Sequence, residues 1–233
     1  IGSFYDYQIS VALSNTTGIG DFYQHYGNII SHLLYVIAGV CLFKGLKKKG
    51  ERFNTLAWGV LGFSLFWTFY SFLDTSGKYL REVYGYEPGQ AGSFLPLTLS
   101  MLTWIALACL TAWLANLILD DEKADLLLAI GSVILIGGIF SEFINAELKD
   151  FAGRPRYKYL LTLDDPAGEY RNWWEMTPYL KDESAFRSWP SGHMTKATIM
   201  LALPMLADVV NCKKAYLRNL LFAFAVFWVA VMG

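Results

Sequence analysis

The sequence predicts an all-α protein: a polytopic bundle of transmembrane helices, with about six spans in 233 residues. Three observations support this class. Hydrophobic residues make up 55% of the chain and charged residues only 17%. The apolar residues gather into six long runs that hold nearly half of the chain, and several approach the roughly 20 residues that cross a bilayer. A chain of this length has no soluble core large enough to bury six such segments, which excludes a soluble globular domain.

Each apolar run is expected to form one helix. Pro204 lies inside the fifth run and is expected to kink it. Five glycines within the second and fourth runs are expected to let helix backbones approach closely: Gly59, Gly62, Gly131, Gly137 and Gly138. In chain order the six runs are Ile29–Phe43, Leu56–Leu73, Phe94–Leu119, Leu126–Ile144, Met194–Val210 and Leu220–Gly233.

The connections between the runs indicate the orientation, because short loops rich in Lys and Arg stay on the cytoplasmic side of a membrane. One such connection spans residues 44–52 and another spans residues 213–218. The acidic turn Asp120–Asp125 is then also inside. The last outer segment is basic as well, so the density of basic residues, and not their total number, gives this orientation. Alternation places three segments outside the membrane: 1–26, 74–93 and 145–193.

Residues 1–233 are expected to form a single integral-membrane domain that is cut at both ends. The chain starts at Ile1 without an initiator Met and stops at Gly233 inside an apolar run. Aromatic side chains in the outer segment 1–26 are typical of a membrane-surface belt. A net charge of −1 argues against a nucleic-acid partner. The three cysteines lack metal-ligand spacing and are expected to be small apolar fillers.

The first polar cluster follows the fourth run. Glu142, Asn145 and Lys149 are spaced by three and four residues, so they share one face of a continuing helix. Gly153 and Pro155 are expected to end that helix. For Glu142, which lies near membrane depth, pairing with Lys149 or with Lys196 of a neighbouring helix is favoured over a functional role.

Two arginines lie in the turn just beyond this helix end. Arg154 and Arg156 can fold back toward Lys149, and three cations at one helix end can clamp a phosphate. Contact with lipid headgroups explains the cluster equally well when it is taken alone.

The second polar cluster is residues 188–193, directly before the fifth run. Pro190 and Ser191 predict a helix start with Ser191 as the N-cap. The N–H groups of Gly192 and His193 would then lack partners within the helix and could bind an anion, which Gly192 allows to approach the backbone. His193 adds a group that can donate a proton near neutral pH.

Together the two clusters resemble the type 2 phosphatidic acid phosphatase superfamily of membrane lipid phosphatases, which more distantly includes vanadium-dependent haloperoxidases. Its signature has three parts: Lys, six residues, Arg-Pro; then Pro-Ser-Gly-His; then Ser-Arg, five residues, His, three residues, Asp. Lys149 and Arg156 match the first part, with Tyr157 where the family has Pro, and residues 190–193 match the second in full. The third part is absent and is expected just beyond Gly233. The likeness covers the chain from Lys149 onward, while earlier residues match only as generic spans.

The resemblance implies a role for each matched residue. Lys149 and Arg156 would hold phosphate oxygens, Ser191 and the Gly192 amide would complete the cradle, and His193 would protonate the leaving group. Three further residues are candidates for support: Arg154, Pro190 and Glu142.

The family's nucleophile is the histidine of the third motif, which forms a phosphohistidine intermediate. No residue of this chain receives that role. His25 and His32 are the other histidines, and both belong to the N-terminal outer region or the first span.

The expected function is hydrolysis of a lipid-linked phosphate or pyrophosphate. By resemblance the substrate is of the phosphatidic acid, phosphatidylglycerol phosphate or undecaprenyl pyrophosphate class. The protein is expected to cross the plasma membrane several times, with its active site on the extracytoplasmic face. Its expected partners are the lipid substrate and membrane lipids. The sequence does not indicate an oligomeric state.

No metal or other cofactor is expected, because Lys, Arg and a helix N-terminus can stabilise a transferred phosphoryl group by themselves. The Asp, Glu and His residues also show no ligand spacing. Two other functions stay open: a lipid phosphotransferase, and a non-enzymatic membrane protein that binds an anion or a lipid.

Overall fold

The structure is a computed structural model that describes residues 27–84, 94–172, 175, 184–210 and 216–232. In this part of the chain all regular secondary structure is helical, with one isolated backbone bridge between Leu119 and Val210. The all-α prediction is therefore confirmed. The predicted aromatic segment 1–26 lies outside the described residues.

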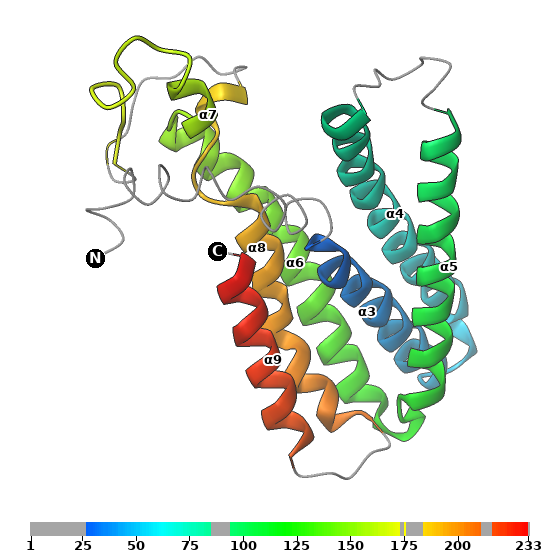
Figure 1. The fold of residues 1–233 in the computed structure, drawn as a ribbon. Helices are drawn as coiled ribbons and strands as arrows, with labels where there is room; N and C mark the ends of the chain where they lie inside the picture. The colour runs from blue at the N-terminus through cyan, green and yellow to red at the C-terminus, as the bar shows by residue number, and fades with distance from the viewer. Residues whose placement is uncertain (1–26, 85–93, 173–174, 176–183, 211–215, 233) are drawn as a thin grey trace.

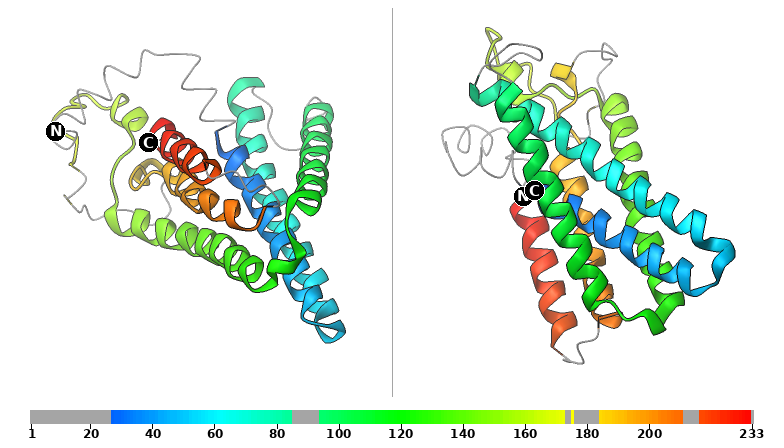
Figure 2. Two further views of the ribbon diagram at one scale, coloured as in Figure 1. Left: turned by 90° about the horizontal axis from the view of Figure 1, so that it is seen from below. Right: turned by 90° about the vertical axis from the view of Figure 1, so that its right-hand side faces the viewer.

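Helix α3, Asn28–Lys48, lies at the centre of the bundle (Figure 1, Figure 2). It contacts the helices on both sides of it. Within α3, 61% of the membrane-length window is buried, against 17–33% in the other three long helices. The first apolar run thus supplies the core, and the later helices surround it.

Helices α4 and α5 pack on α3 from one side, and α6 packs on it from the other (Figure 1). Helix α8 continues directly into the 3₁₀ segment η4, which packs between α6 and α9. The bounds are α4 Asn54–Tyr84, α5 Phe94–Ile118, α6 Ala124–Ala152, α7 Tyr157–Leu160, α8 Gly192–Thr198, η4 Ile199–Asp208 and α9 Leu217–Met232. Three short 3₁₀ turns complete the order: η1 Glu51–Phe53, η2 Asp121–Lys123 and η3 Ser184–Phe186.

In the described part of the chain four helices are long and apolar enough to cross a membrane, namely those of the first four predicted runs. The 21 residues of α3 span about 32 Å, close to the roughly 30 Å of a bilayer's hydrocarbon layer. The fifth run is α-helical only to Thr198 and then 3₁₀, with Pro204 inside the 3₁₀ segment. The expected kink at Pro204 is therefore a change of helix type over ten residues, which suits a residue without a backbone N–H. The sixth run forms the 16-residue α9.

The outward faces of the long helices are apolar. Large side chains stand mostly exposed on α4, α5 and α6, such as Phe66 at 63%, Trp113 at 58% and Phe140 at 63%. Soluble monomers rarely expose continuous apolar patches of this kind. The surface of the bundle therefore suits a hydrocarbon surrounding better than water.

Close helix contacts depend on some of the predicted glycines and not on others. A β-carbon on Gly131 would lie 2.9 Å from the Ala38 carbonyl oxygen, and one on Gly138 would lie 2.5 Å from the Tyr35 ring. These two residues bring α6 against α3, as predicted. At Gly59, Gly62 and Gly137 an added β-carbon meets nothing within 4 Å, so the prediction was wrong there.

Charged pairs join the short connections at one end of the bundle, which we call the loop end. Lys44 Nζ lies 2.6 Å from Asp121 Oδ1 and also donates to two carbonyl oxygens at the end of α5. Further contacts link the same connections: Lys48 to Glu122 at 2.7 Å, Lys49 to Asp125, Lys123 Nζ to the Asp208 carbonyl at 2.8 Å, and Arg218 to Asp208. The connections predicted on one side of the membrane thus lie together.

Candidate functional site

The opposite end of the bundle carries both polar clusters. Helix α6 ends at Ala152, and Gly153 caps it in the left-handed conformation with φ 58°, donating its N–H to the Lys149 carbonyl at 3.1 Å. Only glycine adopts this conformation readily. The chain therefore turns sharply at the predicted place, and Lys149 stays in the last turn of the helix.

Ser191 is the N-cap of α8, as predicted. Its Oγ accepts a hydrogen bond from the Met194 N–H at 3.3 Å. Asn145, buried on α6, donates to Thr195 Oγ1 at 2.6 Å and to the Ser191 carbonyl at 3.5 Å. A side-chain amide thus fixes the start of α8 against α6, and Asn145 and Thr195 become part of the site.

Lys149 lies beside Gly192. A β-carbon added to Gly192 would lie 3.8 Å from Lys149 Nζ and 3.9 Å from Asn145 Oδ1. The open side of the glycine therefore faces the ammonium group. Two motifs that are more than forty residues apart in the sequence are in contact here.

Backbone hydrogen bonds hold the rest of the two clusters side by side. The Arg156 N–H donates to the Ala185 carbonyl at 2.6 Å, and the Ser188 N–H donates to the Arg154 carbonyl at 3.1 Å. Lys149 Nζ donates to the Arg187 carbonyl at 3.2 Å. The segment before Ser191 therefore runs along the turn that follows α6.

Arg187 and Asp150 are further residues of this region that sequence reasoning did not single out. Their side chains form an ion pair, with 2.9 Å between Arg187 Nε and Asp150 Oδ1. Asp150 follows Lys149 in α6, and the Arg187 carbonyl accepts from Lys149. The pair therefore fixes the segment that positions the lysine. No spacing in the sequence indicates it, because the partners lie on either side of a long loop.

The other predicted site residues differ in their solvent exposure. Arg154 is half-buried and donates to the Arg171 carbonyl at 3.0 Å and to the Tyr170 hydroxyl. The Arg156 side chain is exposed. His193, the second residue of α8, is half-buried directly after Gly192. Pro190 is half-buried and follows Trp189 through a cis peptide bond.

Glu142 stands apart from this group. It lies two turns before Lys149 on α6, about 10 Å along the helix axis. Its Oε1 accepts a hydrogen bond from the Tyr35 hydroxyl at 3.1 Å. The expected pairing with Lys149 or Lys196 was therefore wrong, because the partner of the carboxyl group is a tyrosine of the central helix.

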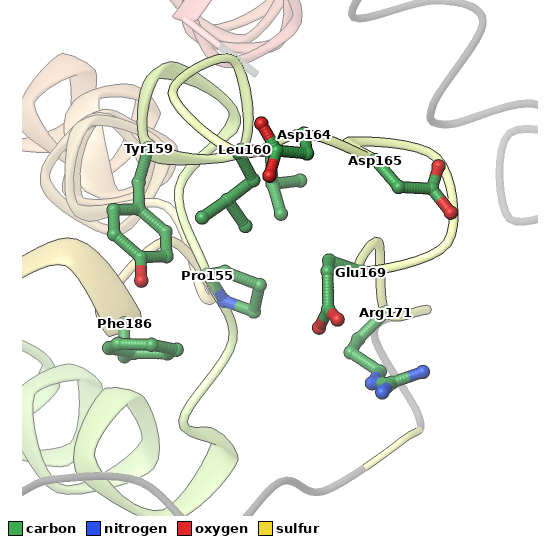
Figure 3. Close-up of a pocket in the computed structure, with 9 residues that line it drawn as sticks. Pro155, Tyr159, Leu160, Asp164, Asp165, Glu169, Arg171 and Phe186 are labelled. Carbon is green, nitrogen blue, oxygen red and sulfur yellow. The ribbon is translucent and has the colours of Figure 1, made fainter.

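A pocket of about 660 Å³ lies next to the site, in the loop that follows α6 (Figure 3). Tyr159 and Phe186 lie on one side of it, with ring centroids 5.3 Å apart, and Asp165, Glu169 and Arg171 lie on the other. Its carboxylates would repel a phosphate. Its full lining is Pro155, Tyr159, Leu160, Leu163, Asp164, Asp165, Glu169, Arg171 and Phe186.

The site thus brings a cation to the first residue of a helix. Lys149 provides a positive charge and donates to the Arg187 carbonyl, and Gly192 leaves the adjacent backbone open. Among the described residues, no group of three or more His, Cys, Asp or Glu side chains could hold a metal ion. No family model, curated protein or solved structure matches this chain.

Proposed function

We propose that this protein is an integral-membrane phosphatase that hydrolyses a lipid-linked phosphate or pyrophosphate. The observation that supports it is the position of Lys149 beside Gly192, with 3.8 Å between Nζ and an added β-carbon. A lysine ammonium next to an open backbone at a helix start is a suitable place for a phosphoryl group. The resemblance of the two motifs to the type 2 phosphatidic acid phosphatase superfamily points to the same chemistry.

The proposal includes six crossings of the plasma membrane. Helices α3, α4, α5 and α6 have the length and apolarity for this, and we assign the α8–η4 segment and α9 as the fifth and sixth spans. The basic loop end would then face the cytoplasm. The two polar clusters would lie at the outer surface, where a lipid can present its phosphate while its tail remains in the bilayer.

In this scheme the charge of the transferred group is stabilised by positioned cations and N–H groups. Lys149 and Arg156 hold phosphate oxygens, the N-terminal N–H groups of α8 bind a third, and His193 protonates the leaving group. Ser191 contributes as the cap of α8, because its Oγ accepts a hydrogen bond from the Met194 N–H. The proposal assigns no nucleophile among residues 1–233.

The test is an assay of the native full-length protein in detergent against a panel of lipid phosphates and pyrophosphates. We expect release of inorganic phosphate that EDTA does not reduce. His193→Ala and Arg156→Ala should each abolish turnover while the helix content, measured by circular dichroism, stays the same. Arg52→Ala is the matched control for Arg156→Ala, because Arg52 is an exposed arginine at the loop end.

Three results would contradict the proposal. Loss of activity with EDTA would exclude the metal-free scheme. Transfer of phosphate to an added alcohol, with no release to water, would identify a phosphotransferase. Saturable phosphate binding without turnover on any substrate would identify a non-enzymatic binder.

A further inference from the structure

The central helix carries a buried polar face near its N-terminal end. Asn28, Ser31 and His32 are only 4%, 1% and 2% exposed. With Tyr35 they are spaced by three, one and three residues, which places all four on one side of α3. Burying polar side chains in an apolar bundle costs free energy, so residues of this kind usually have a function.

Several polar atoms on this face have no hydrogen-bond partner in the described part of the chain. They are Asn28 Oδ1, Ser31 Oγ, and both ring nitrogens of His32. Leaving a buried donor or acceptor unsatisfied costs about 1–3 kcal/mol. Nearly all such groups in folded proteins are bonded to protein or to ordered water. Four unsatisfied atoms within two helical turns therefore indicate an occupant.

The surroundings of His32 place this face where three helices meet. Helix α3 contacts both α6 and α8. The ring of Tyr35 lies 6.5 Å from that of His32, centroid to centroid, and its hydroxyl donates to Glu142 on α6. The buried polar face thus continues onto α6.

The mixture of donors and acceptors identifies the class of occupant. Asn28 Oδ1 only accepts, a neutral histidine offers one donor and one acceptor, and Ser31 Oγ does both. An anion would meet the acceptors, and among the described residues no group of three or more His, Cys, Asp or Glu side chains could hold a metal ion. A hydroxyl group can bond to any atom of the set, because it both donates and accepts, and more than one hydroxyl is needed to satisfy all four atoms.

We propose that Asn28, Ser31 and His32 form an internal binding site for a hydroxyl-bearing species. This is water, or the alcohol group of a lipid headgroup. Helix α3 contacts α8, which begins at Gly192 of the proposed phosphate seat. Its presence does not depend on the proposed function.

Radiolytic hydroxyl-radical footprinting of the unmodified protein tests this directly, because radicals form from the water that lies beside a residue. We expect His32 to be oxidised at a dose that leaves Cys41 intact. Cys41 is the matched control: it lies in the same helix, is 0% exposed within the apolar core, and carries the more reactive side chain. Met194, which is 43% exposed, confirms the dose. A His32 that stays as unmodified as Cys41 would exclude water as the occupant.

A second measurement separates water from a lipid hydroxyl. In a chain with Cys41→Ala, Cys109→Ala and Cys212→Ala, the variant Ser31→Cys should react with a small neutral methanethiosulfonate reagent, whose local concentration does not depend on vesicle charge. Equal rates in phosphatidylcholine and phosphatidylglycerol vesicles identify water as the occupant, and a slower rate in phosphatidylglycerol identifies the lipid alcohol. The control retains Cys41 as its single thiol and keeps Ser31. A Ser31→Cys thiol as unreactive as Cys41 in both vesicles would contradict either form of the site.

Discussion

The two ends of the bundle use the same basic side chains in different ways. At the loop end the cations face carboxylates: Lys44 with Asp121, and Lys48 with Glu122. At the opposite end Arg187 pairs with Asp150, while Lys149 donates to the Arg187 carbonyl and Arg154 donates to the Arg171 carbonyl and the Tyr170 hydroxyl. Neutral oxygens position a basic side chain at both ends, because Lys44 donates to two carbonyls and Lys149 donates to one. The ion pairs of the loop end join its short connections, and the opposite end carries the residues of the proposed phosphate seat.

The largest effect that this comparison predicts is on catalysis. Lys149→Met in the full-length protein should lower phosphate release by about 10²–10³-fold, the usual result of removing one group that stabilises the transition state. Lys48→Met is the control at the loop end, where Lys48 is exposed and paired with Glu122. Initial rates of phosphate release measure both variants. Equal losses of activity in the two variants would show that the two ends of the bundle do not differ in function.

The next largest effect concerns stability at the loop end. Lys44 is only 8% exposed, and its ammonium bonds to the Asn116 and Leu119 carbonyls at 2.7 and 2.9 Å as well as to Asp121. Lys44→Met leaves those carbonyls without their donor and should cost about 2–3 kcal/mol of unfolding free energy. Denaturant unfolding in detergent provides the measurement. Activity per folded molecule should not change, and a specific loss of activity would mean that the two ends are coupled.

A smaller effect concerns the helix contact that connects the two ends. Gly137 and Gly138 are neighbours in α6, yet a β-carbon on Gly138 would lie 2.3 Å from Ile199 Cδ1 while one on Gly137 meets nothing within 4 Å. Gly138→Ala should therefore destabilise the bundle by about 1–3 kcal/mol. Gly137→Ala should stabilise it by about 0.5–1 kcal/mol through helix propensity. Thermal unfolding midpoints of the pair should move in opposite directions, and a shift in the same direction would contradict the close packing of α6.

The smallest effect concerns the exposed pair of Lys48 and Glu122, whose side chains are 49% and 80% exposed. A double-mutant cycle with Lys48→Ala and Glu122→Ala should give a coupling of about 0.2–1 kcal/mol, as solvated ion pairs do. High salt should reduce it further. A coupling energy as large as the stability loss in Lys44→Met would show that the strength of these contacts does not follow their solvent exposure.

Local signals in the sequence predicted the elements of the site well. Gly153 ends α6 because a left-handed residue is needed there, and Ser191 caps α8 because its hydroxyl reaches the Met194 N–H. Each of these depends on residues at most four apart. The first four apolar runs also correspond to helices long enough to cross a membrane, because length and apolarity are properties of one segment.

Contacts between distant segments were harder to predict from the sequence. Glu142 bonds to Tyr35, more than a hundred residues earlier, and Arg187 pairs with Asp150 across the outer loop. The glycine prediction was right for Gly131 and wrong for Gly137 because only the packed structure decides which face of α6 meets α3. The rotation of a helix about its axis is set by its partners, and no pattern within the helix fixes it.

The central claim is that two distant motifs build one phosphate seat, and phosphate binding tests it most directly. We would titrate inorganic phosphate into the detergent-solubilised protein and follow its ³¹P resonance. The account predicts saturable broadening that Lys149→Met abolishes and Lys48→Met preserves. Broadening that is absent in the unaltered protein, or that survives in Lys149→Met, would contradict it.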